Sequence, residues 1–320
     1  FANFGTICAE YAGISAAGSL VGIPSFISAP IAGVLICAVV LLGSFHRVER
    51  VLLVISSTLA LYIVDGILAA PDWSEVWHNS IVPHMPVNEL GWIAIAAALG
   101  TTLAPWGLAF IQSYAVDKKI TVADLHWERV DVVIGSLLTG VIGLAIAVAC
   151  AATLNRAGIH IEDAADVAEA LRPLAGSFAT TLFGAGLLGA SLLAAAIVPL
   201  ATSYSIAEGI GAPASLDLDS HHFQYFYAAF VGLSVAAVSV VSLPGLPLIP
   251  LIYTSQVVNA VMLPLHVIAL QLLARDRSVM GDAASGNKTQ IAGWISIVLI
   301  MACVAALMVS WINTWFGSSV

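Results

Sequence analysis

The sequence predicts an all-α polytopic membrane protein, and three observations lead to this fold class. Hydrophobic residues make up 60% of the 320 residues and charged residues only 9%, whereas soluble domains carry roughly a quarter charged residues. The mean hydropathy is +1.00. The apolar residues also gather into stretches of about 20, the length at which an α-helix crosses the hydrocarbon core of a bilayer. We therefore expect a single transmembrane domain over 1–320.

About nine transmembrane helices are predicted, one for each apolar stretch. In chain order the stretches are residues 2–22, 27–45, 50–70, 89–115, 131–153, 177–207, 224–243, 246–273 and 290–315. Short turns such as Gly22-Ile23-Pro24 and Leu243-Pro244-Gly245 separate neighbouring stretches, which suits antiparallel helices. The stretch at 89–115 is expected to be interrupted.

The basic residues predict the orientation, because cytoplasmic loops of membrane proteins carry an excess of Lys and Arg. If the loop after the second stretch is cytoplasmic, eight of the ten basic residues lie on that side: Arg47, Arg50, Lys118, Lys119, Arg129, Arg275, Arg277 and Lys288. Only Arg156 and Arg172 lie on the other side. The chain is thus expected to start at the cytoplasmic face of the cytoplasmic membrane and to end outside.

Several functional classes are disfavoured. A net charge of −9 offers no basic surface, so no nucleic-acid partner is expected. No HExxH or GxSxG motif occurs, and the GxGxxG match at 184–189 lies inside an apolar helix, where it favours close helix packing. We expect neither enzymatic activity nor a cofactor. The cysteines lie in apolar stretches, which argues against disulfides: Cys8, Cys37, Cys150 and Cys303.

The stretch at 89–115 contains a break. Gly100, Thr101, Thr102 and Pro105 fall near mid-membrane. Pro105 has no N–H to donate to the carbonyl of Thr101, and a free carbonyl in hydrocarbon is costly unless it lines a cavity or binds something. Two interpretations remain open, a simple proline kink and a discontinuous helix of the kind that binds ions in transporters.

Two further groups of polar residues lie within predicted helices. Gln256 and Asn259 are three residues apart, so they share a helix face. They either hydrogen-bond within the helix bundle or line a pathway. Glu10 is an acid within the first stretch and is either a structural carboxyl or a functional group.

These motifs resemble the Nramp family of divalent metal transporters. The run Gly100-Thr101-Thr102-Leu103-Ala104-Pro105-Trp106, followed by Gln112 and Val116-Asp117-Lys118-Lys119, is similar to the family's sixth helix. Ser255-Gln256-Val257-Val258 with Leu263-Pro264-Leu265 is similar to its tenth, and Ala9-Glu10 to its third. Where typical members have Met-Pro-His, this chain has Ala104-Pro105-Trp106, which resembles the Nramp-related magnesium transporters.

The resemblance implies the LeuT-type fold, with two inverted five-helix repeats and an ion site at the first helix of each. Residues 1–70 would then be the last three helices of the first repeat, 89–273 the second repeat, and 290–315 an added helix. The chain starts at Phe1 without an initiator Met, and we expect it to lack the family's first two helices.

The resemblance also implies the site residues. The metal would be bound by the Thr101 carbonyl, the Ala104 position and Gln256. Residues that would line the pathway or support the site are Glu10, Pro105, Trp106, Gln112 and Asn259. Because Ala104 offers no sulfur, the replacement favours Mg²⁺, with Mn²⁺ tolerated, over softer metals.

Ile7 and Trp106 stand where proton-coupled members have Asp and His, so we expect transport without proton coupling. The expected partners are a divalent cation and the lipid bilayer. Two alternatives remain, an amino-acid or Na⁺-coupled symporter of the same fold and a non-transporting membrane sensor or scaffold.

Overall fold

Nearly all of the described chain is helical. The computed structural model describes residues 2–42, 70–82, 89–152, 179–215 and 224–317, with isolated positions between 50 and 67. The predicted helix at 50–70 lies largely outside these residues. The chain divides into two compact units. The first comprises Phe1–Asn3, His84–Ala109 and Tyr253–Val320, and the second comprises Phe4–Pro83 and Phe110–Ile252.

Six helical segments in the described residues are long and apolar enough to cross a membrane: Ser25–Leu42, Gly91–Asp117, Val122–Cys150, Phe183–Gly209, Leu248–Arg275 and Asn287–Val309. A shorter apolar helix covers Tyr225–Val241. Helices satisfy their own backbone hydrogen bonds, which lipid cannot do for them. The fold class, an all-α polytopic membrane protein, is confirmed, whereas the count of nine helices stays a prediction.

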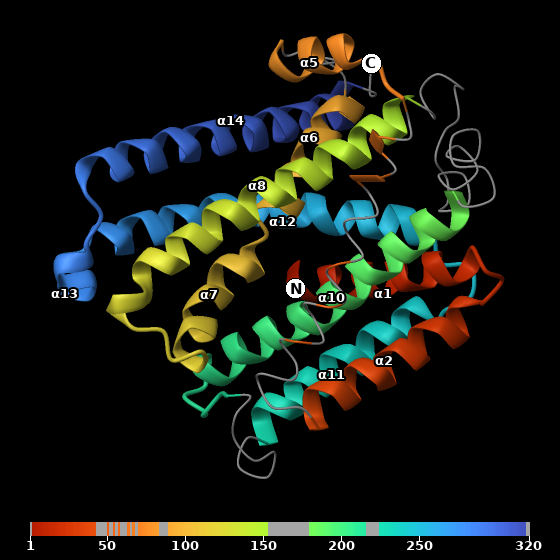
Figure 1. Cartoon of the computed structure of the whole chain (residues 1–320), viewed down its shortest axis with the longest axis horizontal. Coiled ribbons are helices and arrows are strands. Elements are labelled where there is room, and N and C mark those ends of the chain that lie inside the picture. The colour runs from red at the N-terminus through yellow and green to blue at the C-terminus, as the bar shows by residue number, and fades with distance from the viewer. Residues whose placement is uncertain are drawn as a thin grey trace. The chain divides into compact units, whose positions relative to one another are not determined.

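The second unit contains α1 (Ala2–Ser19), α2 (Ser25–Leu42), α5 (Trp73–Ile81), α8 (Leu125–Cys150), α10 (Ala179–Gly209) and α11 (Gln224–Val241). The helices α10, α11 and α2 pack against one another (Figure 1). Aromatic rings fill part of this packing, since Tyr204 of α10 meets Phe226 of α11 edge-on at a centroid distance of 4.7 Å. Both side chains are buried.

The first unit is built on α6 (Glu89–Thr102), the greater part of α12 (Leu248–Arg275), and α14 (Asn287–Gly317). Two short helices, α13 (Arg277–Met280) and η5 (Gly281–Ala283), connect α12 to α14. A core of mostly small residues joins the three long helices: Ala96, Ala97, Val257, Ala260 and Leu307. Small side chains let helix backbones approach closely in a membrane protein, which matters for the site described next.

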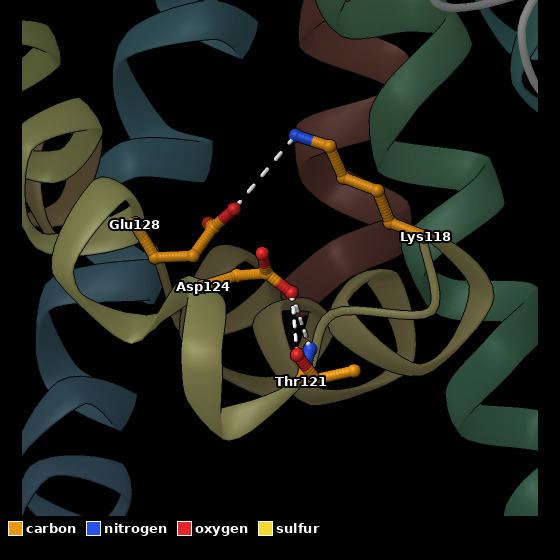
Figure 2. Close-up of polar contacts among 4 residues, drawn as sticks. All are labelled: Lys118, Thr121, Asp124 and Glu128. Atoms are coloured by element: carbon orange, nitrogen blue, oxygen red, sulfur yellow. Dashed lines mark hydrogen bonds and ion pairs between the residues drawn. The ribbon is translucent and has the colours of Figure 1, made fainter.

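The helix α7 (Pro105–Asp117) ends in a tight turn before η2 (Val122–Asp124) and α8. Lys119 adopts a left-handed conformation with φ of 58°, and the N–H of Ile120 donates to the carbonyl of Ala115 at 3.0 Å. This is the Schellman arrangement that ends helices. Figure 2 shows the next residues, where Asp124 accepts hydrogen bonds from the backbone N–H and hydroxyl of Thr121 at 2.9 and 2.7 Å.

Candidate functional site

The predicted break is present as two separate helices, α6 and α7 (Figure 1). The N–H of Leu103 still donates to the carbonyl of Leu99 at 3.0 Å, and the first bonds of α7 run to the carbonyl of Ala104 from Gly107 and Leu108 at 3.1 and 3.4 Å. Pro105 has no N–H to offer the carbonyl of Thr101. The end of α6 therefore presents a backbone oxygen that the helix itself does not satisfy.

A close crossing of α6 and α12 lies beside this oxygen. A Cβ atom on Gly100 would stand 2.8 Å from the backbone nitrogen of Ala260 and 2.9 Å from the carbonyl carbon of Gln256, and closer still to the oxygen of that carbonyl. Only glycine allows two backbones to approach in this way. The crossing places Gly100, the residue before Thr101, against the turn of α12 that carries Gln256.

The amide side chains on α12 are joined to each other. Asn259 donates from Nδ2 to Oε1 of Gln256 at 3.1 Å, and Gln256 donates from Nε2 to the hydroxyl of Ser255 at 3.3 Å. Asn259 is fully buried, whereas Gln256 is half-buried. The shared helix face predicted from their spacing is confirmed. Because a carbonyl oxygen has two lone pairs, Oε1 of Gln256 can accept from Asn259 and still coordinate a cation.

The other residues at the break differ in exposure. Thr101 is exposed, Ala104 and Trp106 are half-buried, and Pro105 is buried. The hydroxyl of Thr102 donates to the carbonyl of Ala98 at 2.6 Å, so it caps its own helix. Among the described residues no group of three or more His, Cys, Asp or Glu side chains could hold a metal. The atoms at the break that could coordinate a cation are neutral oxygens. This ligand type suits hard cations such as Mg²⁺.

The remaining predicted residues belong to the second unit. Glu10 lies in α1 and is half-buried. Gln112 lies in α7, where its Nε2 is 3.4 Å from a carboxylate oxygen of Glu208 in α10. The break lies in the first unit, so these two residues are described apart from it.

Contacts between α7 and α10 were missed by the sequence analysis. Glu208 accepts a hydrogen bond from the hydroxyl of Ser113 at 2.7 Å, and the hydroxyl of Tyr204 bonds to the carboxylate of Asp117. These side chains, with Gln112, line a cavity of about 240 Å³. The sequence did contain a sign of this contact. Tyr204 and Glu208 are four residues apart, so they share one face of α10, and Glu208 is the only acidic residue of that helix.

A weaker ion pair connects the turn after α7 to α8. Nζ of Lys118 lies 3.9 Å from Oε1 of Glu128, with side-chain exposures of 35% and 29% (Figure 2). Exposed pairs of this kind contribute about 0.2–1 kcal/mol. The bond from Ser113 to Glu208 is shorter and charge-assisted, and is worth about 1.5 kcal/mol, the lower end for charged partners because Glu208 is exposed. The contacts with α10 therefore contribute more.

Comparison with known proteins connects this geometry to a family. A family model described as natural resistance-associated macrophage protein-like matches residues 1–310. Three relatives are each named divalent metal cation transporter MntH. That of Clostridium acetobutylicum is 23% identical over 247 residues, covering 75% of this chain and 54% of its own length.

The other two relatives give similar values. That of Caldanaerobacter subterraneus subsp. tengcongensis is 25% identical over 289 residues, covering 87% of this chain and 66% of the relative. That of Aeromonas hydrophila is 25% identical over 260 residues, covering 79% and 60%. The chain thus spans 54–66% of the length of these relatives.

Proposed function

The chain belongs to the natural resistance-associated macrophage protein (Nramp) family, and from this membership we propose that the full-length protein carries divalent metal cations across the membrane by alternating access. The names of three relatives support this class of substrate. The single observation that carries the proposal is the break between α6 and α7 beside Gln256, because ion-coupled transporters bind their ions at discontinuous helices.

In this proposal the metal is cargo at the break. The carbonyl of Thr101 and Oε1 of Gln256 supply oxygen ligands, and Ala104 leaves room for a hydrated ion. Asn259 orients the amide of Gln256 through the 3.1 Å hydrogen bond. Pro105 frees the carbonyl of Thr101, since it has no N–H to donate.

Mg²⁺ is the proposed preferred cargo, with Mn²⁺ tolerated. Mg²⁺ takes oxygen ligands, gives up its water reluctantly and usually keeps several water molecules. A thioether at position 104 would favour softer metals, and alanine removes both the sulfur and its bulk. The half-buried Ala104 at the start of α7 is consistent with this proposal.

The finer architecture is part of the proposal. We assign the LeuT-type fold, with residues 89–273 as the second repeat and 290–315 as an added helix. The protein is assigned to the cytoplasmic membrane with residue 1 at the cytoplasmic side, and it acts as a transporter without enzymatic activity or a resident cofactor. The distribution of Lys and Arg supports the orientation.

Transport is proposed to be uncoupled from protons. Ile7 and Trp106 cannot exchange a proton, and residues 225–241 of α11 contain no Asp, Glu, His, Lys or Arg. A membrane potential that is negative inside suffices as driving force. The free energy released when a charge moves down this potential is about 2.3 kcal/mol per 100 mV for a single charge and about twice that for a divalent cation.

Liposomes containing the full-length protein test this function. With a negative-inside potential, Mg²⁺ or Mn²⁺ is expected to enter while the internal pH stays constant, measured with metal-sensitive and pH-sensitive dyes. Acidification in proportion to metal uptake would overturn the uncoupled mechanism. Uptake of neither metal would overturn the transport function itself.

Replacing Gln256 by leucine is expected to lower metal affinity about tenfold, or 1.4 kcal/mol, because one ligand oxygen is lost. Isothermal titration calorimetry measures this. The control is Gln271→Leu on the same helix, where Nε2 donates to the carbonyl and side-chain oxygens of Gln290 at 2.9 and 2.8 Å. The control should lower thermal stability but leave the affinity at the wild-type value. Equal affinities in both variants would remove Gln256 from the site.

A further inference from the structure

The last turns of α10 carry two side chains, Tyr204 and Glu208, that contact α7, the cytoplasmic half of the broken helix. Glu208 accepts a hydrogen bond from the buried hydroxyl of Ser113 at 2.7 Å, and Gln112 lies 3.4 Å from its other carboxylate oxygen. One carboxylate thus bonds to two adjacent residues of α7. A single point of attachment would leave the helix free to pivot, but this contact is not alone.

Tyr204, one helical turn before Glu208, makes the second attachment. Its hydroxyl bonds to the carboxylate of Asp117, and its ring lies 5.7 Å from the ring of Phe110. The same ring also meets the ring of Phe226 of α11, at a centroid distance of 4.7 Å. Tyr204 is only 2% exposed, so its ring is packed against the rings of Phe110 and Phe226. The contacts on α7 run from Phe110 to Asp117 and cover two turns.

We propose that Tyr204 and Glu208 are positioning residues that join α7 to α10, so that the cytoplasmic half-helix and the end of α10 move as one body. The proposal rests on the proposed function, because α7 begins at Pro105, beside the metal site. A helix of 13 residues is about 20 Å long and acts as a lever between the contacts and the break. Loosening the far end changes how the half-helix moves between states without removing a metal ligand.

Hydrogen exchange on the full-length protein without metal tests the attachment of α7 to α10 directly, and its outcome does not depend on transport. In Glu208→Ala, amides of residues 110–117 are expected to exchange about tenfold faster, because local opening follows the lost contacts. Glu208→Gln keeps an oxygen acceptor for Ser113 but loses the charge and the acceptor for Gln112, so its exchange should lie between that of the wild type and that of Glu208→Ala. Glu128→Ala removes only the exposed pair with Lys118 and is the matched control. Unchanged exchange in Glu208→Ala, at an unchanged melting temperature, overturns the proposal.

Tyr204→Phe separates the two attachments. It keeps the ring contacts with Phe110 and Phe226 and removes the hydroxyl that bonds to Asp117, so residues 114–117 should exchange faster while residues 110–113 do not. An equal increase along the whole helix would mean that the variant disturbs the packing of α10, and would overturn the role given to the hydroxyl.

Transport kinetics distinguish positioning from metal binding. Glu208→Ala is expected to lower the turnover of Mn²⁺ uptake about fivefold while KM stays within about twofold of the wild type, since the residue touches no metal in the proposed site. A rise in KM with unchanged turnover would make Glu208 a cation ligand and overturn the positioning role. If exchange changes as expected but neither the wild type nor any variant transports metal, the attachment of α7 to α10 is supported and the proposed function is wrong.

Discussion

Replacing Gly100 by valine is expected to destabilise the protein by roughly 3 kcal/mol or more, because overpacking against rigid atoms is costly. The atoms that a Cβ would meet belong to the backbone of α12 at Gln256 and Ala260, and they cannot rotate away as a side chain can. The helices α6 and α12 must separate instead. Their shared core of Ala96, Ala97 and Val257 would then lose contacts. The melting temperature in detergent measures the effect, and metal binding should be lost in the same variant.

Gly107→Ala is the matched control. Gly107 lies in α7, two residues after Pro105, and apart from its chain neighbours and the backbone of its own helix a Cβ there would meet no heavy atom within 4 Å. Alanine in a helix interior is favoured over glycine by about 0.5–1 kcal/mol, so this variant should be slightly more stable than the wild type. If Gly100→Val melts at the wild-type temperature, the backbones of α6 and α12 do not cross at Gly100.

The second large effect concerns the choice of metal. Ala104→Met is expected to raise the affinity for Cd²⁺ relative to Mg²⁺ about tenfold or more, or 1.4 kcal/mol, because a thioether is a soft ligand that Mg²⁺ does not use. Competition between the two metals in a binding assay on the full-length protein measures the ratio. Turnover of Mg²⁺ should fall, since methionine fills space that a hydrated ion needs.

Ala104→Leu separates the sulfur from the bulk. Leucine is similar in size to methionine but offers no ligand, so it should impair Mg²⁺ uptake without improving Cd²⁺ binding. A Cd²⁺ to Mg²⁺ ratio that is the same in the methionine variant and the wild type would show that position 104 does not face the ion. The missing thioether at position 104 would then not explain a preference for Mg²⁺.

Local features of the site could be predicted from sequence. The break is predicted from Gly100, Thr101, Thr102 and Pro105 together; a proline alone is not enough, since α2, α10 and α12 each continue past an internal proline. The bond between Gln256 and Asn259 follows from their spacing, because residues three apart share a helix face. Helix positions also follow, since about 20 apolar residues in a row have one stable conformation in lipid.

Contacts between distant segments could not be predicted in the same way. Gly100 is one glycine among 26, and nothing nearby in the sequence marks the approach to Gln256. The bond from Ser113 to Glu208 joins residues 95 apart. In a membrane helix the outer face is as apolar as the core, so hydrophobicity does not tell which side meets a neighbour. The packing of α6 on α12 and of α7 on α10 therefore required the structure.

The break between α6 and α7 also divides an electric dipole. The carbonyl end of α6 carries roughly half a negative charge and the amide end of α7 roughly half a positive charge. Any cation in the break is attracted toward Thr101 and repelled from the first turn after Pro105. The repulsion lowers the free energy gained on binding, and it grows as the half-helix approaches. Moving α7 by its far end would thus change how tightly an ion is held without moving a single ligand.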